Sequence, residues 1–418
     1  MSDETFYHAH EIIEERCDGR LECVRTCPTR ALRVRNKKVR FLSDLCIDCG
    51  ECINVCPERV FVPISDTMED LKSFKYHLVF PSNILYAQFG QEVHPLLIRQ
   101  ALKNIGFNDV VEVAHLCEEM GFALLHHLET HPDIRPLISS FCPAVVRFVQ
   151  VAYPNLVKHI APLDVPREVA ARETKHRYSK KLGLKPEEIG VIYVTPCPAK
   201  IVSIKQPAEK VPSSLDGAIP IKDIYNLILP EIIKMQQKGT FKNPKEFKFG
   251  TGWGILGHFS RAVGAEKCLS VAGLDHLKQI LDDIESTKLR DVDFIEALAC
   301  IQGCVNGLFC VKNPYVARHN AIQMEAKYGA SSPLDKKKVL RNYEKGHYFY
   351  ESPVLPRTTR VTETDIAESI KQMKKKERIY AKLPKNNCCL CGAPTCETFA
   401  EDCARNEADI TDCIFFSK

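Results

Sequence analysis

A run of four cysteines near the amino terminus constrains the fold more than any other feature of this 418-residue chain. Cys46, Cys49 and Cys52 are separated by two residues each, and Cys56 follows three residues later, directly before Pro57. Two-residue gaps allow one loop to place three soft thiolates around an iron–sulfur cubane, whereas the fourth cysteine of such a run binds a neighbouring cluster. The run therefore predicts a segment that folds around iron–sulfur clusters.

An earlier segment has the same frame but lacks one member. Cys17, Cys23 and Cys27 are spaced as in the first run, and Cys27 also precedes a proline, Pro28. Arg20 stands where the second cysteine should be. The two runs together resemble a bacterial two-cluster ferredoxin, in which the last cysteine of each run crosses to the other cluster. Short strands are expected at residues 31–34 and 39–42, on either side of a turn.

The crossing rule divides these seven cysteines into two ligand sets. The first set is complete and the second has three members: Cys27, Cys46, Cys49 and Cys52, and then Cys17, Cys23 and Cys56. The three-cysteine set predicts a 3Fe–4S cluster, a 4Fe–4S cluster with a non-cysteine ligand, or no cluster. His8, His10 and Asp18 are candidates for that ligand, although each is also an ordinary surface residue type. Zinc is disfavoured, because zinc sites use four ligands.

The whole chain has twenty cysteines but no recognisable secretory signal. It begins Met-Ser-Asp-Glu-Thr, and no uncharged apolar run approaches the ~20 residues that a membrane span needs. We therefore expect thiolates that serve metal clusters in a reducing cytoplasm, and no membrane insertion. The net charge of +4 is too small to indicate a nucleic-acid partner.

The central part of the chain alternates between strand and helix patterns. Strands are expected at 78–80, 110–113 and 190–195, and helices at 95–105, 118–129 and 143–160. This alternation predicts an α/β domain with parallel sheets flanked by helices. Ligands of such sheets bind beyond the carboxyl ends of the strands, and Ser82 and Cys197 fall at such positions.

Four further cysteines in this part lie in three short motifs. The motifs are Phe-Cys-Pro-Ala at 141–144, Thr-Pro-Cys-Pro-Ala-Lys at 195–200 and Ala-Cys-Ile-Gln-Gly-Cys-Val-Asn-Gly at 299–307. They contain Cys142, Cys197, Cys300 and Cys304. Any one of them alone would be an ordinary buried thiol, but the set and its order resemble the active-site motifs of the FeFe hydrogenases. The resemblance implies a two-lobed H-cluster domain, in which these cysteines hold a 4Fe–4S cluster and Cys304 also bridges to a two-iron subcluster with CO, CN and azadithiolate.

Lys200, Pro81 and Ser82 complete the site that this resemblance implies. In the family, the lysine that matches Lys200 faces a cyanide ligand of the two-iron centre, and a buried lysine needs such an anionic partner. Pro81 and Ser82 match the segment that packs and hydrogen-bonds around another cyanide. With Cys304, these are the expected catalytic residues, and the implied activity is the interconversion of H2 with protons and electrons.

The chain departs from the fast members of the family along their proton path. Phe141 stands where they carry a proton-relay cysteine, Ala161 where they carry a serine, and Ser203 where they carry a glutamate. A relay needs titratable groups within hydrogen-bond reach, and Phe141 cannot titrate, so slow turnover is expected. Three acids are candidates for another route, although each is also typical of a surface or a helix cap: Glu118, Glu119 and Glu296.

Residues 250–257 are rich in glycine and contain the single tryptophan of the chain, Trp253. The segment lacks the lysine of a phosphate-binding loop and the spacing of a dinucleotide fingerprint. We therefore expect it to pack closely near the cofactor, with Trp253 in the core.

The carboxyl-terminal segment contains a third group of cysteines. Residues 364–380 predict an amphipathic linker helix. Four cysteines follow it: Cys388, Cys391, Cys396 and Cys413. Their spacing resembles a small four-cysteine iron–sulfur domain that also occurs in sensory hydrogenases, with a zinc knuckle as the alternative and Cys389 as a competitor of Cys388. A helix is expected to begin near residue 395 and to point its positive end at the cluster.

Four domains are expected: a ferredoxin-like two-cluster module at 1–76, an H-cluster domain at 77–345, a linker helix at 346–384 and a small helical 4Fe–4S domain at 385–418. The sequence hypothesis is a slow FeFe hydrogenase of the sensory branch, without a PAS domain, that passes electrons through 4Fe–4S clusters to a ferredoxin or another redox subunit. Its two-iron centre would need hydrogenase maturation proteins. The alternatives are a hydrogen or redox sensor that signals to a kinase or phosphatase, and an electron-transfer protein without the two-iron centre.

Overall fold

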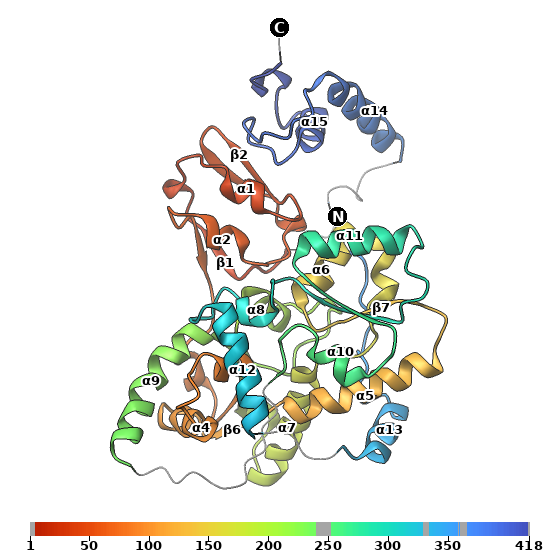
Figure 1. Ribbon diagram of the computed structural model, residues 1–418. Helices are drawn as coiled ribbons and strands as arrows, with labels where there is room; N and C mark the ends of the chain where they lie inside the picture. The colour runs from red at the N-terminus through yellow and green to blue at the C-terminus, as the bar shows by residue number, and fades with distance from the viewer. Residues whose placement is uncertain (1–4, 240–251, 329–333, 358, 360–365, 417–418) are drawn as a thin grey trace.

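The computed structural model describes residues 5–239, 252–328, 334–357, 359 and 366–416. Figure 1 shows an amino-terminal module of short strands and helices, a large central region and a pair of carboxyl-terminal helices. The amino-terminal module lies between the other two parts. Among the described residues, no helix is both long enough and apolar enough to cross a membrane.

Two antiparallel strand pairs form the amino-terminal module, β1 with β4 and β2 with β3. The two strands expected from the sequence are confirmed, each with its bounds moved by one residue. Asn36 and Lys37 form the turn between them with positive φ angles of 50° and 59°, which suits a tight hairpin. The elements are β1 (His10–Ile12), α1 (Glu22–Thr26), β2 (Leu32–Arg35), β3 (Lys38–Phe41), α2 (Glu51–Val55) and β4 (Phe61–Pro63).

The larger sheet of the central region has four parallel strands in the order β6-β5-β8-β9. Every residue of β8 is buried, as expected of a parallel strand with helices on both faces. β5 and β8 end at the same edge, so the segments of Ser82 and Cys197 come together there. The elements of this lobe are β5 (Tyr76–Pro81), α3 (Asn83–Ala87), α4 (Pro95–Asn104), β6 (Asp109–Val110), α7 (Pro166–Leu182), β8 (Ile189–Thr195), α8 (Pro198–Lys205), β9 (Gly217–Pro220) and α9 (Ile221–Gln237).

The second sheet has three parallel strands in the order β10-β11-β7. Its middle strand, β11, is fully buried and leads into the loop that carries Cys300 and Cys304. The predicted α/β architecture with parallel sheets flanked by helices is therefore confirmed. The elements are α5 (Ala114–Thr130), β7 (Leu137–Ile138), α6 (Pro143–Ala152), α10 (His258–Val263), β10 (Cys268–Ala272), α11 (Leu274–Glu285), β11 (Phe294–Leu298), α12 (Pro314–Tyr328) and α13 (Lys336–Glu344).

Two predicted elements of this region are shorter than expected. The helix predicted at 143–160 ends at Ala152 and is followed by a separate 3-10 helix, η4 (Pro154–His159). The break follows from Pro154, which has no amide hydrogen and forces Tyr153 out of the helical conformation, to φ −135° and ψ 57°. The strand predicted at 110–113 ends at Val110, because the chain turns into α5 at Ala114.

The carboxyl-terminal part consists of α14 (Ile366–Lys382) packed on α15 (Cys396–Ala404). The linker helix is confirmed from residue 366 onward, and its predicted residues 364 and 365 lie outside the described part. α15 begins as predicted, because the Thr395 side chain accepts a hydrogen bond from the Thr398 amide at 3.1 Å. Ile379 packs against this helix, whereas Ile370 and Met373 are about half exposed.

Candidate metal centre

Cys142 and Cys197 occupy equivalent positions in the two lobes. Each lies at the N-cap of a helix, α6 and α8 respectively, and each is followed by a proline in the first turn. Proline suits that turn because its missing amide hydrogen would have no partner in the helix. The positive end of a helix stabilises a thiolate. The Cys-Pro motifs therefore aim two thiols from opposite lobes at one place.

Cys300 and Cys304 reach the same place from the loop after β11. Gly303 has a φ of 91°, and a Cβ there would lie 2.4 Å from the carbonyl oxygen of Gly254. The Cys304 amide donates to that carbonyl at 2.7 Å. A Cβ on Gly307 would lie 2.4 Å from the carbonyl oxygen of Pro196. The glycines of this motif thus hold the Cys304 loop against the backbone beside Cys197.

The Lys200 ammonium lies close to the sulfurs of two of these cysteines. Its ammonium nitrogen Nζ lies 3.3 Å from the sulfur Sγ of Cys304 and 3.8 Å from that of Cys197, and the residue is 6% exposed. Burial alone would lower the pKa of Lys200, but the facing thiols raise it well above its usual value. Burial raises the pKa of Cys142 and of Cys300. The neighbouring thiols raise both pKa values further, whereas the Lys200 ammonium opposes the rise. Four thiols gathered around one buried ammonium suit a metal cluster.

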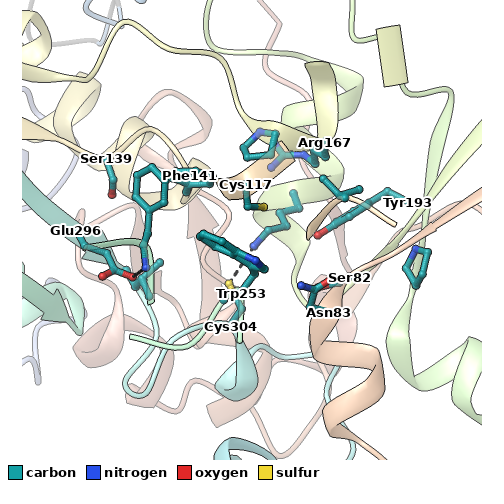
Figure 2. A pocket seen from close by; sticks show the side chains of 17 residues that line it. Ser82, Asn83, Cys117, Ser139, Phe141, Arg167, Tyr193, Trp253, Glu296 and Cys304 are labelled. Atoms are coloured by element: carbon teal, nitrogen blue, oxygen red, sulfur yellow. Dashed lines mark hydrogen bonds between the residues drawn. The ribbon is translucent and has the colours of Figure 1, made fainter. Parts of the chain in front are cut away.

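A cavity of about 110 Å³ adjoins these thiols (Figure 2). Pro81, Ser82, Lys200 and Cys304 line it, so the structure brings together all the residues expected to be catalytic. Ser82 is buried at the end of β5, where its oxygen Oγ also accepts the amide hydrogen of Ile84 and caps α3. The Pro81–Ser82 segment and the Cys304 loop therefore border the same cavity, as the sequence predicts.

Other residues also line the cavity wall, among them Arg167. Cys117, Tyr193 and Asn83 line it too and were not predicted from the sequence. Cys117 carried no signal, because a cysteine on the buried face of a helix is an ordinary core residue. Trp253 was expected in the core, but it is only partly buried and also lines the cavity. Its segment does pack closely, because Gly254 lies against Cys304 and Ile84; residues 250 and 251 lie outside the described part.

None of the three residues that stand in place of the usual proton path has a titratable side chain. Phe141 lines the cavity, and its ring centroid lies 4.0 Å from that of Phe259. Ala161 is buried. Ser203 donates to the Lys200 carbonyl at 2.9 Å and accepts from Arg167 at 2.9 Å.

The three alternative acids differ in position. Glu119 accepts hydrogen bonds from Lys338 and Tyr348, away from the cavity, and Glu118 does not line the cavity either. Glu296 lines the cavity and is 4% exposed. Its carboxylate accepts the amide hydrogens of Gly257 and Ser260, so it also caps α10.

The seven cysteines of the amino-terminal module gather in two groups that match the crossing rule. Cys27, Cys46, Cys49 and Cys52 line one cavity, which Pro198 of the central region also borders. A second cavity is lined by Cys17, Cys23 and Cys56. Burial raises the pKa of Cys23 to about 12, and the neighbouring Cys56 and Cys17 add to the rise.

Two of the three candidate replacement ligands lie elsewhere. His8 and His10 face the buried Asp48, at 3.1 and 3.6 Å, and neither lines the three-cysteine cavity. Burial opposes ionisation of Asp48, but hydrogen bonds from His10 and His8 hold its pKa well below the usual range. Asp18 does line the three-cysteine cavity, where its carboxylate accepts from Arg20 at 2.8 Å. Of the three candidates, only Asp18 lies beside the three-cysteine set in this structure.

The carboxyl-terminal cysteines also converge. Cys391, Cys396 and Cys413 share one apolar cluster. Burial raises the pKa of Cys391 to about 11, and the neighbouring Cys413 and Cys388 add to the rise. Cys389 instead points its sulfur at the Pro394 carbonyl, at 3.1 Å. This geometry favours Cys388 over Cys389 as the fourth member.

Comparison with protein-family models gives three matches. The model described as "Iron only hydrogenase large subunit, C-terminal domain" matches residues 78–266 and 259–308. A 4Fe-4S dicluster domain matches residues 10–57, and the model described as "Putative Fe-S cluster" matches residues 383–415.

Curated relatives fall into two kinds. The NADP-reducing hydrogenase subunit HndD of Solidesulfovibrio fructosivorans is 23% identical over 242 residues, which cover 50% of this chain and 41% of that protein. Iron hydrogenase 1 of Clostridium pasteurianum is 23% identical, over 50% of this chain and 44% of that protein. The match therefore spans less than half of each hydrogenase. The probable cytosolic Fe-S cluster assembly factor oxy-4 of Caenorhabditis elegans is 22% identical, over 65% of this chain and 71% of that protein.

Solved structures share the fold of the central region. A structure described as showing stepwise H-cluster assembly in the [FeFe]-hydrogenase HydA(deltaEFG) aligns with a TM-score of 0.51 and 14% identity, over 70% of this chain and 97% of that one. The [FeFe]-hydrogenase HydA1 of Chlamydomonas reinhardtii aligns with a TM-score of 0.50 over the same shares. Since the hydrogenase model covers more than half of the sequence, the chain belongs to the iron-only hydrogenase family and carries an amino-terminal iron–sulfur module of the ferredoxin type.

Proposed function

We propose that this chain is a slow FeFe hydrogenase that interconverts H2 with protons and electrons at an H-cluster held by Cys142, Cys197, Cys300 and Cys304. The observation that carries the proposal is Lys200, a buried ammonium 3.3 Å from Cys304 on the wall of an internal cavity. A cubane alone gives no reason to bury a lysine beside an adjoining space, whereas an anionic group in that space would offset the cost. The proposal also assigns a ferredoxin-like module to 1–76, the H-cluster domain to 77–345, a linker to 346–384 and a 4Fe–4S domain to 385–418.

The residues present fit such a group. The four thiols are a suitable donor set for a cubane, and Cys304 also borders the cavity where a two-iron unit would lie. Arg167 is 7% exposed, and its Nε is buried without a partner among the described residues. Lys200 and Arg167 thus offer two cationic donors for anionic ligands such as cyanide. When bound, the two-iron group supplies the redox chemistry on hydrogen.

The remaining residues would position the group and exclude water. Phe141 and Trp253 line the cavity with apolar surface, and Ser82 lies on the side opposite Phe141 (Figure 2). Pro81 also lines the cavity. The Phe141 side chain cannot bind a proton, so protons must reach the cavity by a route that does not use it.

Glu296 offers the route that the hydrogen bonds support. Its Oε2 accepts from the hydroxyl of Ser270, an exposed residue, at 3.1 Å, and the Ser270 hydroxyl lies 2.9 Å from that of Ser260. This chain of oxygens leads from the cavity wall to the surface. The backbone amides of Gly257 and Ser260 also donate to this carboxylate and hold it on the cavity wall. Slow turnover is expected because Phe141 stands in place of the usual relay cysteine.

Infrared spectroscopy tests the proposal directly. Protein with reconstituted iron–sulfur clusters is incubated anaerobically with a diiron–azadithiolate precursor, and the CO and CN stretching bands are recorded with and without H2. Lys200→Met should abolish these bands while the cubanes remain. Lys205→Met is the matched control, because Lys205 lies on the same helix but pairs with Asp66 at 2.6 Å, outside the cavity. The control should retain the bands.

Each outcome separates the candidate functions. Bands that appear in the natural sequence and shift under H2 support hydrogen chemistry. Intact cubanes without any bands contradict it and favour an electron-transfer or assembly role, as the likeness to oxy-4 suggests. Bands that shift under H2 with negligible turnover favour a hydrogen sensor, which the replacements at Phe141, Ala161 and Ser203 also favour.

A further inference from the structure

The carboxyl-terminal domain is attached to the ferredoxin-like module by a buried ionic contact. Asp402 on α15 accepts hydrogen bonds from Arg33 at 2.6 and 3.1 Å and from Arg35 at 2.7 Å. The Asp402 side chain is only 3% exposed. A buried carboxylate is tolerated only where several charged donors satisfy it, so this contact fixes the domain in one orientation against β2.

The loop that carries Cys391 lies directly on the backbone of β2. The Val34 amide donates to the carbonyl of Gly392 at 2.8 Å, and Arg35 donates to the carbonyl of Cys391 at 2.6 Å. Gly392 has a φ of 76°, and a Cβ there would lie 1.8 Å from the Val34 carbonyl oxygen, so only glycine fits. Val34 in turn packs in the same apolar core as Cys23 and its neighbours.

The opposite end of the module touches the central site. A Cβ on Gly50 would lie 3.3 Å from Pro198 and 3.2 Å from Leu308. Pro198 follows Cys197 and also borders the cavity of the complete cysteine set. The three parts that carry the cysteine groups therefore follow one another in a line, from the carboxyl-terminal domain through the ferredoxin-like module to the central region (Figure 1).

One helix at the outer end of this line, α14, is basic. Six cations and two acids lie on it: Lys371, Lys374, Lys375, Lys376, Arg378 and Lys382, against Glu368 and Glu377. The acids of the neighbouring carboxyl-terminal domain lie outside this helix, on α15 and in the segment after it: Glu397, Glu401, Asp402, Glu407, Asp409 and Asp412. Exposed apolar side chains flank the cysteines of that domain, with Leu390 51%, Ile414 65% and Phe415 50% exposed. Apolar residues beside a redox site, with a basic helix in the same part of the chain, suit a protein partner of negative charge.

We propose that the carboxyl-terminal domain, together with the linker helix α14 that packs on it, is the electron port of this chain, at which an acidic one-electron carrier protein docks on α14. Electrons then cross the contact between Gly392 and Val34 and reach the central site through the complete cysteine set. Each transfer oxidises the reduced carrier by one electron and reduces the cluster held by the carboxyl-terminal cysteines by one, with no bond made or broken. The proposal rests on the proposed function for the presence of the clusters.

Stopped-flow reduction of the full chain tests the port. The chain is reconstituted with iron–sulfur clusters but without the two-iron unit, and the bleaching of cluster absorbance is followed after mixing with a reduced acidic ferredoxin that carries two 4Fe–4S clusters. Lys374→Glu/Lys382→Glu should lower the second-order rate constant about tenfold at low salt, with a smaller effect at high salt. The matched control is Lys180→Glu/Lys278→Glu, which makes the same charge change at exposed sites on α7 and α11 and should leave the rate within about twofold.

A second variant removes the port without altering its surface charge. Cys413→Ser should lower the rate at which the ferredoxin reduces the remaining clusters at least tenfold, whereas photoreduced deazaflavin, which needs no docking site, should still reduce them. Unchanged reduction by ferredoxin in both variants overturns the proposal and places electron entry elsewhere. Because the two-iron unit is absent throughout, failure of hydrogen chemistry in the infrared experiment leaves this result unaffected.

Discussion

Asp402→Asn should loosen the contact between the carboxyl-terminal domain and β2. The substitution keeps the size of the side chain but removes the charge that lies between Arg33 and Arg35, whose side chains are 8% and 18% exposed. Removing one partner of a buried ion pair costs about 3–5 kcal/mol, because the remaining charge stays desolvated. Since two guanidiniums are left and Arg35 has some access to water, we expect the lower end, about 3 kcal/mol.

The hydrogen bond from Val34 to Gly392 provides the assay. It crosses the contact, so the Val34 amide exchanges with deuterium when the domain separates. A loss of about 3 kcal/mol corresponds to a roughly 150-fold increase in the open population, and hence in the exchange rate of this amide. Hydrogen–deuterium exchange of peptides covering residues 31–36 measures it.

Glu401→Gln is the matched control on the same helix. Glu401 pairs with Arg405 one turn away at 3.5 Å, and such partly exposed pairs contribute only about 0.3–0.5 kcal/mol. Exchange at Val34 should therefore stay within about threefold. If Asp402→Asn leaves the exchange of Val34 within twofold of the natural sequence, at about the precision of the assay, while α15 stays folded, the buried ion pair does not hold the domains together and the reasoning is refuted.

Two further predictions concern the central region. Phe141→Cys places a thiol on the cavity wall and should raise H2 turnover at least tenfold, because a positioned acid typically contributes 10²-fold or more. The rate is expressed per two-iron unit, whose assembly is measured by the infrared bands. An unchanged rate would show that proton delivery is not limiting. Burial, with help from the neighbouring Glu168, raises the pKa of Asp164 to about 6. The folded state therefore holds the proton to higher pH than the unfolded state, so the free energy of unfolding should fall by about 1.4 kcal/mol between pH 5 and pH 8 from this group alone. Asp164→Asn should remove that decrease in urea titrations at the two pH values, and an equal pH dependence in both proteins would falsify the assignment.

Much of the site follows from local patterns in the sequence. Each Cys-Pro pair predicts a thiol at a helix start, because proline is restricted to the first turn, and α6 and α8 begin accordingly. The crossing of Cys27 and Cys56 between the two runs likewise follows from fixed spacing. These features depend on residues that are close in the chain, so few conformations compete.

Other features depend on which distant segments meet. Nothing in the sequence around Cys117 or Tyr193 distinguishes them from core residues, and only the approach of α5 and β8 to the Cys304 loop places them on the cavity wall. His8 and His10 were plausible ligands by proximity in sequence. The pairing of β1 with β4 and the buried Asp48 direct them away from the three-cysteine cavity.

By itself, the sequence determined the cysteine motifs, the alternation of strands and helices and the loss of the usual proton-relay residue. Each of these depends on residue types and their spacing within a short stretch of the chain. Only the tertiary structure decided that the ferredoxin-like module lies between the carboxyl-terminal domain and the central region. The charge of Asp402 and the absence of a side chain at Gly392 have meaning only opposite Arg33 and Val34, more than 350 residues earlier in the chain. Such long-range contacts depend on packing and desolvation of both partners together, which no local pattern records.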